Sequence, residues 1–168
     1  MSSGSITVST PLGTLAITER DGALVAIDWH APPASQRRST VLLQRAKSQL
    51  ERYFAGALTQ FALPCAPAGT AFQQRVWAAL CRIPYGETIT YGELARRVGS
   101  APRAVGAACG ANPLPIVIPC HRVVARNGAL HGYSGMGGLD TKARLLALER
   151  GEADLFGSGA DRPGRIAS

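Results

Sequence analysis

Apolar and β-branched runs separated by turn residues predict strands along the first part of the chain. The stretch ITVSTPLGTLAITERDGALVAIDW, residues 6–29, places apolar and β-branched runs on either side of turn residues at Pro11–Gly13 and Asp21–Gly22. Short runs joined by tight turns are typical of antiparallel strands. We therefore expect two or three strands here, followed by a loop around Pro32–Ser35.

The pattern becomes helical from Thr40 to about Phe54. The apolar positions that recur there at helical spacing are Val41, Leu42, Ala46, Leu50 and Phe54. Such spacing predicts an amphipathic helix, and Gly56 is suited to end it. Residues 57–69 hold two prolines and no helical period, so we interpret them as a linker.

Two helices are predicted directly after the linker. The first carries an apolar face from Thr70 to near Ile83–Pro84. The second is predicted from a capping box, Thr90 with Glu93 three residues on, and extends through Val98.

A third helix follows closely in this part of the chain. Gly99 and Pro102 separate it from the second, and its sequence, RAVGAACG, is rich in small residues. Two short helices joined by a tight glycine-containing turn fit a helix-turn-helix. A helical hairpin in a core gives the same pattern, but the basic charge on these helices favours the DNA-binding form.

Residues 115–124 read PIVIPCHRVV, and their apolar flanks predict a buried strand. Pro119 favours a bend before the polar centre. Asn127–Gly128 is a strong hairpin-turn signal, and a hairpin after a helix-turn-helix is typical of a winged helix. A Gly-rich loop, GYSGMGG, then leads to a last helix, TKARLLALER, closed by Gly151. We expect residues 152–168 to form a frayed tail.

Composition and charge narrow the class of protein. Of the 168 residues 46% are hydrophobic, which predicts a packed core. No apolar run reaches the length of about 18 residues that suggests a membrane span. The N-terminal sequence MSSGSITVST lacks the features of a secretory signal, so we expect a cytoplasmic protein.

The positive charge is concentrated in one part of the chain. The formal net charge is +7, and residues 75–126 hold seven arginines against two acidic residues. A basic stretch of this kind suggests a polyanionic partner, with nucleic acid first. A generic basic protein kept soluble by its charge would show the same balance, so charge alone leaves both interpretations open.

The four cysteines form no metal or disulfide framework. No two have a CxxC spacing, and none has a histidine at zinc-finger distance. We interpret Cys65, Cys81 and Cys109, which lie among apolar or small residues, as inert buried thiols. Cys120 differs from them because a histidine and an arginine follow it.

Cys120, His121 and Arg122 bring together a nucleophile, a base and a fixed positive charge. A cysteine attacks as its thiolate, and an ordinary pKa of about 8.5 leaves little of it ionised at neutral pH. Side chains adjacent on a strand point to opposite faces, so His121 needs a bend or a bridging water to reach the thiol. Glu149 is the best-placed acid to orient the imidazole. Arg122 is expected to be structural, through a salt bridge or bonds to backbone carbonyls.

Other roles for Cys120 are weaker. A metal ligand or a redox thiol needs partners that the surrounding sequence lacks. A plain structural thiol is the remaining alternative, and the polar neighbours argue against it because they would be costly in an apolar core.

The segment NPLPIVIPCHRVV, residues 112–124, closely resembles the active-site segment of the O6-alkylguanine-DNA alkyltransferases, or methylated-DNA–protein-cysteine methyltransferases. The resemblance continues through FQQRVWAAL, IPYGETITYGELA, RAVGAACGANP, GYSG and LLALERG, and covers most of residues 70–151. The N-terminal half resembles the family only loosely, through TPLG and YFAG.

The resemblance implies an α/β protein of two domains. Residues 1–68 would form a small N-terminal α/β support domain, an antiparallel sheet plus a helix, with its linker. Residues 69–151 would form a C-terminal winged helix-turn-helix domain that binds DNA and carries the active site. Residues 152–168 would be a flexible tail.

The resemblance also implies DNA repair by direct reversal of damage. Cys120 would take the alkyl group from O6-alkylguanine, and also from O4-alkylthymine, in one irreversible transfer. The base would be flipped out by a helix-turn-helix in the minor groove. No cofactor and no metal are implied, because the damaged base is itself the alkyl donor. The implied partner is double-stranded DNA containing O6-alkylguanine, bound by a monomer that can cluster on DNA, with no membrane involved.

Individual roles carry over to matching positions. The residues implied in catalysis are Cys120, His121, Glu149, Tyr91 and Asn112. Those implied in holding the flipped base are Tyr133, Ser134, Val123 and Lys142. Those implied in DNA binding are Arg103, Ala104, Thr90 and Gly106.

The resemblance assigns a specific task to several of these residues. His121 would deprotonate Cys120 through a water, and Asn112 would tie the helix-turn-helix to the active-site segment. Tyr91 would bond the N3 side of the guanine. Arg103 would fill the gap that the flipped nucleotide leaves.

One departure and two alternatives qualify the resemblance. The loop YSGMGGLDTK carries two more residues before Lys142 than the usual family pattern, which bears on the placement of Ser134 and Lys142.

A non-catalytic alkylated-DNA-binding relative would have replaced the cysteine, so the presence of Cys120 argues against it. A winged-helix thiol sensor would usually carry an effector domain or a dimerisation helix, and the sequence suggests neither.

Overall fold

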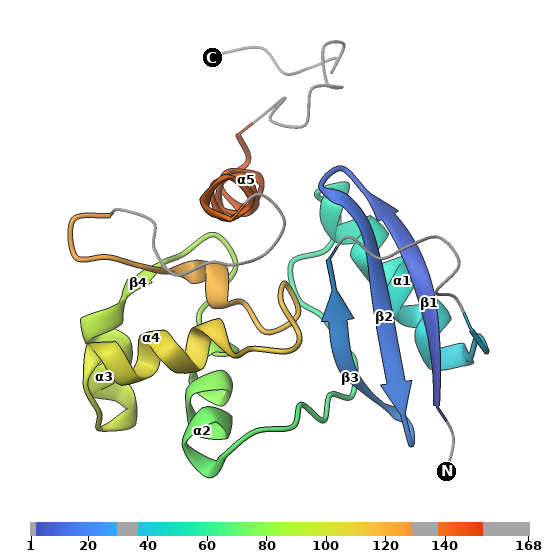
Figure 1. Ribbon diagram of the computed structural model, residues 1–168. Helices are drawn as coiled ribbons and strands as arrows, with labels where there is room; N and C mark the ends of the chain where they lie inside the picture. Colours follow the sequence, from blue (N-terminus) through green and yellow to red (C-terminus); the bar gives the residue numbers. More distant parts are fainter. Residues whose placement is uncertain (1–2, 30–36, 129–137, 153–168) are drawn as a thin grey trace.

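The N-terminal half is a three-stranded antiparallel sheet packed against one helix (Figure 1). The computed structural model describes residues 3–29, 37–128 and 138–152. The strands and helix are β1 (Ser3–Thr10), β2 (Gly13–Arg20), β3 (Ala23–Asp28) and α1 (Val41–Phe54). Asp21 and Gly22 both adopt positive φ, as the tight turn between β2 and β3 requires. The predicted strands and helix are confirmed.

The predicted linker, residues 57–69, lies along the edge strand β3. Leu24 accepts a hydrogen bond from the amide of Ala66 at 2.8 Å and donates its own amide to the carbonyl of Pro64 at 2.9 Å. Further along β3, the Ile27 amide donates to the Pro113 carbonyl at 2.9 Å. One edge strand therefore holds both the linker and the start of the active-site segment.

The C-terminal half is helical. Its helices are α2 (Ala71–Leu80), α3 (Tyr91–Val98), α4 (Pro102–Gly110) and α5 (Leu139–Glu149). Helix α3 ends at Gly99 in the left-handed conformation, and α4 begins at Pro102, where the missing amide costs nothing. Helices α2, α3 and α4 pack on one another, so the predicted helix-turn-helix is confirmed.

One helix boundary and one helix cap differ from prediction. Helix α2 ends at Leu80 rather than near Ile83–Pro84, because the chain continues there as tight turns. The capping box at α3 is only half formed. Thr90 accepts the Glu93 amide at 3.0 Å, but the Glu93 carboxylate pairs with two arginines of the next turn instead of returning to Thr90.

The predicted wing lies only partly within the described residues. Strand β5 (Val123–Val124) pairs in parallel with β4 (Ile89–Thr90). Gly128 adopts positive φ and its amide bonds back to the Ala125 carbonyl, so the chain turns here, with Arg126 and Asn127 at the centre of the turn. The second strand of the hairpin, the Gly-rich loop and the predicted tail fall outside the described residues.

The run PIVIPCHRVV is not a strand over most of its length, contrary to prediction. Ile116 adopts a φ of 75°, and Pro115 bridges back to Ile118. After Pro119 the chain enters a 3-10 turn at Cys120–Arg122, so the predicted bend is confirmed. A short apolar run reads alike as a buried strand and as a buried turn, which is why periodicity misassigned it.

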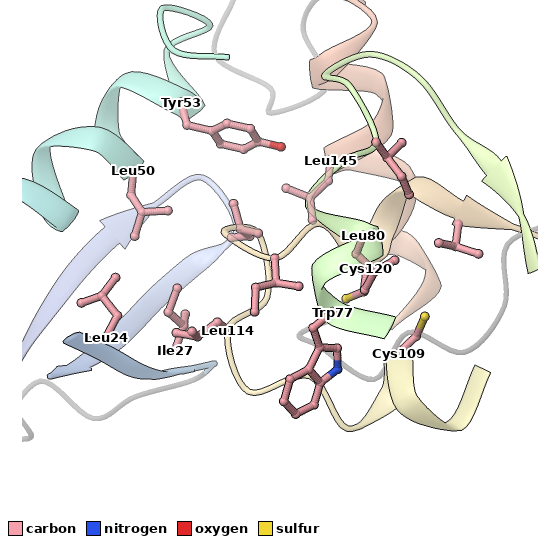
Figure 2. Close-up of a cluster of buried hydrophobic side chains, with 14 of the residues drawn as sticks. Leu24, Ile27, Leu50, Tyr53, Trp77, Leu80, Cys109, Leu114, Cys120 and Leu145 are labelled. Atoms are coloured by element: carbon pink, nitrogen blue, oxygen red, sulfur yellow. The ribbon is translucent and has the colours of Figure 1, made fainter. Parts of the chain in front are cut away.

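The two halves share one hydrophobic core (Figure 2). Figure 2 shows side chains of β3 and α1 meeting those of the C-terminal helices around Leu114, and the labelled residues of this cluster include Leu24, Ile27, Leu50, Trp77, Leu80 and Leu145. Because this core is continuous, the site described below is held by both halves of the chain.

Trp77→Phe tests how α2 is fixed in this core. The buried Trp77 indole donates to the Ala108 carbonyl of α4 at 2.9 Å. Loss of this bond and of ring volume should lower the free energy of unfolding by about 1–3 kcal/mol, measured by urea denaturation. Val41→Ala, at a side chain that is 79% exposed, is the control and should change it by no more than about 0.5 kcal/mol. Equal effects of the two substitutions would contradict this prediction.

Candidate active site

Asn112 holds the active-site segment in its turn. It lies two residues after the end of α4, and its side-chain amide donates to the Ile118 carbonyl at 2.8 Å. Its side-chain oxygen accepts the Leu114 amide at 2.9 Å. One side chain thus closes the loop between the helix-turn-helix and Cys120.

Cys120 begins the 3-10 turn and is buried, with 7% of its surface exposed. Burial raises the pKa of this thiol, and a hydrogen bond with Asn112 and the positive charge of Lys142 oppose the rise. The thiol is therefore protonated at neutral pH in the resting protein. It needs a base before it can attack.

His121 and Glu149 lie together although 28 residues separate them in the chain. The Nε2 atom of His121 is 2.7 Å from Oε2 of Glu149, and both side chains are fully buried. Burial lowers the pKa of His121, more than the neighbouring carboxylate raises it, so the ring is neutral at neutral pH. Because an ionised carboxylate only accepts hydrogen bonds, Nε2 carries the proton and Nδ1 carries the free lone pair.

The Nδ1 atom of His121 has no hydrogen-bond partner among the described residues, although it is buried. An orphaned buried nitrogen is rare in native proteins and is often matched by a water or a ligand. The ring therefore has one nitrogen fixed by Glu149 and one nitrogen whose lone pair has no partner among the described residues.

Arg122 is structural, as expected from the sequence, and makes both kinds of contact considered for it. Its Nε donates to Oε1 of Glu149 at 2.8 Å and its Nη2 donates to Oε2 at 3.0 Å. Its Nη1 donates to the Ile83 carbonyl at 2.6 Å. This bidentate pairing fixes the carboxylate plane that faces His121.

Tyr53 is a member of the site that sequence reasoning missed. Its hydroxyl donates to Oε2 of Glu149 at 2.6 Å, across 96 residues of chain. The Gly86 amide adds a longer contact to Oε1 at 3.3 Å. Burial alone would raise the pKa of Glu149, but the hydrogen bonds from His121, Arg122 and Tyr53 lower it to about 2. The YFAG match at residues 53–56 was the only signal that could have pointed to this tyrosine.

Lys142 and Tyr91 form a second polar pair close to the thiol. The Lys142 Nζ donates to the Tyr91 hydroxyl at 3.3 Å and lies 5.5 Å from the ring centroid. Burial lowers the pKa of Lys142, while interactions with the Cys120 and Cys109 thiols oppose the change. Burial and the same two thiols raise the pKa of Tyr91 to about 12. Tyr91 thus keeps its proton and can donate it.

The residues expected to bind DNA lie on α3 and α4. Arg103 is exposed at the start of α4, Ala104 is half-buried, and Thr90 caps α3. A methyl group placed on Gly106 would lie 3.9 Å from the Tyr91 ring, so this glycine also packs behind the site. Beside them lies a hollow of about 670 Å³, lined by Thr90, Tyr91, Gly92, Arg96, Pro102, Ala125 and Arg126.

The residues expected to hold the flipped base are only partly described. Val123 is fully buried in β5, and Lys142 has 1% of its surface exposed. Tyr133 and Ser134 fall outside the described residues. The structure therefore brings Lys142 near the thiol and does not place Tyr133 or Ser134.

The prediction that Cys65 and Cys81 are buried is wrong, whereas Cys109 is buried as expected. Both exposed cysteines line a hollow of about 610 Å³ behind the active-site segment, between the linker and α2. Their apolar and small neighbours suggested burial, but Cys65 lies in the linker and Cys81 caps the end of α2, and both are exposed there. Within the described residues, no group of three or more His, Cys, Asp or Glu side chains could hold a metal ion.

Comparison with known proteins places the chain in a family. The family profile described as "6-O-methylguanine DNA methyltransferase, ribonuclease-like domain" matches residues 5–67. The profile described as "6-O-methylguanine DNA methyltransferase, DNA binding domain" matches residues 71–151. No helix in the described part of the chain is long and apolar enough to cross a membrane.

Curated and solved relatives agree with these profiles. The constitutive methylated-DNA–protein-cysteine methyltransferase of Bacillus subtilis (strain 168) is 45% identical over 155 residues, which cover 86% of this chain and 93% of that protein. The crystal structure of Mycobacterium tuberculosis O6-methylguanine methyltransferase has 40% identity and a TM-score of 0.79, covering 90% of this chain and 95% of that one. The structure described as Mycobacterium tuberculosis OGT in complex with DNA has 41% identity and a TM-score of 0.80, covering 90% and 97%. The chain therefore belongs to the methylated-DNA–protein-cysteine methyltransferase family.

Proposed function

We propose that this protein repairs DNA by moving the alkyl group from O6 of guanine, or from O4 of thymine, to the sulfur of Cys120, once per molecule. The observation that carries the proposal is the order of three buried groups. Cys120 is followed by His121, whose Nε2 is fixed by Glu149 and whose Nδ1 has no partner among the described residues. That order suits a base that takes the thiol proton.

The proposed reaction needs no cofactor, because the damaged base supplies the alkyl group and receives the proton. His121 takes the Cys120 proton through a water, and the thiolate attacks the alkyl carbon. A carbon–sulfur bond forms as the carbon–O6 bond breaks, and its electron pair stays on the guanine. Tyr91, protonated and close to the site, donates to the N3 side of the departing base, which finally gains the proton that the thiol lost. The thioether has no good leaving group, so each molecule acts once.

Because the thiol of Cys120 is buried, the damaged DNA base must come to it. A target atom inside a duplex cannot reach a side chain that is 7% exposed, so the damaged nucleotide must be flipped out. We infer that Arg103 enters the stack in its place from the minor groove. Small residues on α4, Ala104 and Gly106, let the helix approach closely, and exposed arginines add sequence-independent phosphate contacts.

The remaining assignments are part of the same proposal. Thr90 contacts the backbone of the DNA, and Tyr133, Ser134, Val123 and Lys142 hold the flipped base. Residues 1–68 form the support domain, 69–151 the DNA-binding domain and 152–168 a tail. The protein works as a monomer on double-stranded DNA in the cytoplasm. No feature of the described residues favours a non-catalytic DNA-binding protein or a thiol sensor instead.

Intact mass measures the proposed transfer directly. After incubation with a duplex carrying O6-methylguanine, we expect each protein molecule to gain one methyl group in place of a proton, mapping to Cys120. Cys120→Ala should gain none. Cys109→Ala is the matched control, because Cys109 is also buried and burial raises its pKa to about 12, and it should still be methylated. Methylation of Cys120→Ala, or an unchanged mass of the wild type, would contradict the proposal.

Arg103→Ala tests base flipping. Flipping costs a few kcal/mol, so losing the residue that fills the gap should slow repair of duplex DNA by about tenfold or more. The rate with free O6-benzylguanine should change little, because that substrate needs no flipping. Arg82→Ala removes the same charge from an exposed position in the turn after α2 and serves as the control. Equal losses on both substrates would rule out a flipping role.

Glu149→Gln tests whether this carboxylate is permanently ionised. The pKa of Glu149 falls from 4.5 to about 2 in the folded protein. The stabilisation linked to that fall is on the order of 3 kcal/mol, is fully present above about pH 4.5, and is lost as the pH drops toward 2. The variant lacks it, so its deficit in unfolding free energy should be large at pH 7 and shrink in acid.

Urea denaturation between pH 7 and pH 3 gives this measurement. Glu93→Gln is the control, because the Glu93 pKa is also lowered, by bonds from Arg96 and Arg97, but at the surface. Exposed pairs contribute little, so Glu93→Gln should cost far less. A Glu149→Gln deficit that does not change with pH would contradict the assignment.

A further inference from the structure

Tyr53 brings the N-terminal half into the chemistry of the site. It lies near the end of α1, far in sequence from every other residue of the site, and none of its surface is exposed. Figure 2 shows its hydroxyl directed away from α1 toward the C-terminal half. The hydroxyl donates to Oε2 of Glu149 at 2.6 Å, which is short for a neutral pair and typical of a donor to a carboxylate.

Tyr53 and His121 share a single acceptor atom. The same Oε2 lies 2.7 Å from Nε2 of His121. A hydrogen bond to a charged oxygen draws electron density from it and weakens its attraction for a second donor. The tyrosine therefore limits how strongly Glu149 can stabilise a proton on the imidazole.

The ring of Tyr53 does not need its hydroxyl to stay in place. It packs edge-on against Phe54 and Tyr85, with centroids 5.3 and 6.2 Å away, and lies 5.4 Å from Phe61. A phenylalanine would fill the same space. A plain core aromatic is the ordinary explanation of such a residue, but it does not account for a hydroxyl placed on the oxygen that orients the base.

We propose that Tyr53 is a positioning residue supplied by the N-terminal half, whose hydroxyl fixes the shared oxygen of Glu149 and so sets the orientation and basicity of His121. The inference rests on the proposed role of His121 as the base that deprotonates Cys120. It gives the N-terminal half a part in the reaction beyond support. The shared core and the hydrogen bond from the Ile27 amide to the Pro113 carbonyl join the two halves that this contact spans.

The other charged groups that face this cluster are few and stay the same when Tyr53 changes. Arg122 covers Glu149 from the 3-10 turn, and Tyr85, with its ring 5.8 Å from the Arg122 guanidinium, lies beside it. Lys142 approaches His121 from α5, and Cys120 precedes it in the chain. Removal of the Tyr53 hydroxyl alone thus tests one of the hydrogen-bond donors to Glu149 while the others stay in place.

Tyr53→Phe should raise the pKa seen in the acid limb of the pH–rate profile for alkyl transfer. With one donor fewer, Glu149 holds the imidazolium more strongly, so His121 becomes more basic by about half a pH unit or more. The rate on the plateau should fall by about threefold or more, because Glu149 without this donor orients the His121 imidazole less firmly. The full-length protein is used, with a duplex carrying O6-methylguanine, at several pH values.

Tyr85→Phe is the matched control. It also removes a tyrosine hydroxyl beside Arg122, but among the described residues this hydroxyl makes no hydrogen bond to Glu149. Its acid limb should stay where it is in the wild type. An acid limb that is unchanged or lowered in Tyr53→Phe, or raised equally in Tyr85→Phe, would overturn the proposal.

A second substitution keeps the test decisive if Tyr53→Phe folds poorly. Site-specific 3-fluorotyrosine at position 53 keeps both ring and hydroxyl but donates more strongly, so the acid limb should move in the opposite direction, to lower pH. No shift, or a shift to higher pH, counts against the role of Tyr53.

His121→Gln separates this inference from the function on which it rests. If His121→Gln transfers the alkyl group at the wild-type rate, the assignment of the base itself fails. If His121→Gln is slow but the Tyr53 substitutions leave the acid limb unshifted, only the role of Tyr53 is removed.

Discussion

A single buried carboxylate, Glu149, is the constraint on which the rest of this structure depends. An ionised carboxylate removed from water is costly unless its oxygens are filled by donors. Here the donors come from α1, from the loop before β4 and from the turn that carries Cys120. These elements are distant in the chain, so satisfying one charge fixes their relative positions. Its pairing with Arg122 contributes geometry more than net stability, because both charges lose their hydration.

The turn at Cys120 is built from backbone that is locally unfavourable. Ile116 is β-branched and adopts a positive φ, a conformation that costs on the order of 1–3 kcal/mol. Burial of Ile116 and its neighbours in the shared core offsets that cost. Asn112 closes the loop from inside, and Pro119 sets the entry to the 3-10 turn. The strained backbone at Ile116 thus lies just before the turn that directs the side chains of residues 120–122 into the protein.

Sequence reasoning reached the parts of the site that follow from local chemistry. A cysteine needs a base and a base needs an orienting acid, and this logic places Glu149 beside His121, where the structure has it. Capping and turn residues located α3, α4 and the N-terminal strands, and helical periodicity located α1 and α2 because their apolar faces repeat. It failed at PIVIPCHRVV, where a short apolar run carries no period that separates strand from turn. It also could not find the parallel pairing of β4 with β5, whose two-residue strands carry no pattern.

The contact of Tyr53 with Glu149 was beyond prediction for a different reason. Nothing in a helical Tyr–Phe pair distinguishes a tyrosine that packs from one that donates across 96 residues. The contact of Tyr53 with Glu149 is seen only in the folded structure, whereas the residue types alone indicated the roles of Cys120 and His121. Residues that act through another residue are in general the ones that local patterns miss.

The resting state of the site suits a protein that is consumed by its reaction. Burial raises the pKa of Cys120, so little thiolate exists to react with stray electrophiles. The base beside it is neutral, and its free nitrogen faces away from Glu149. Reactivity therefore depends on a substrate that reaches a buried thiol and on a base already held in the correct tautomer. The same buried carboxylate that joins the two halves of the chain fixes that tautomer, so structural integrity and readiness to react come from one set of hydrogen bonds.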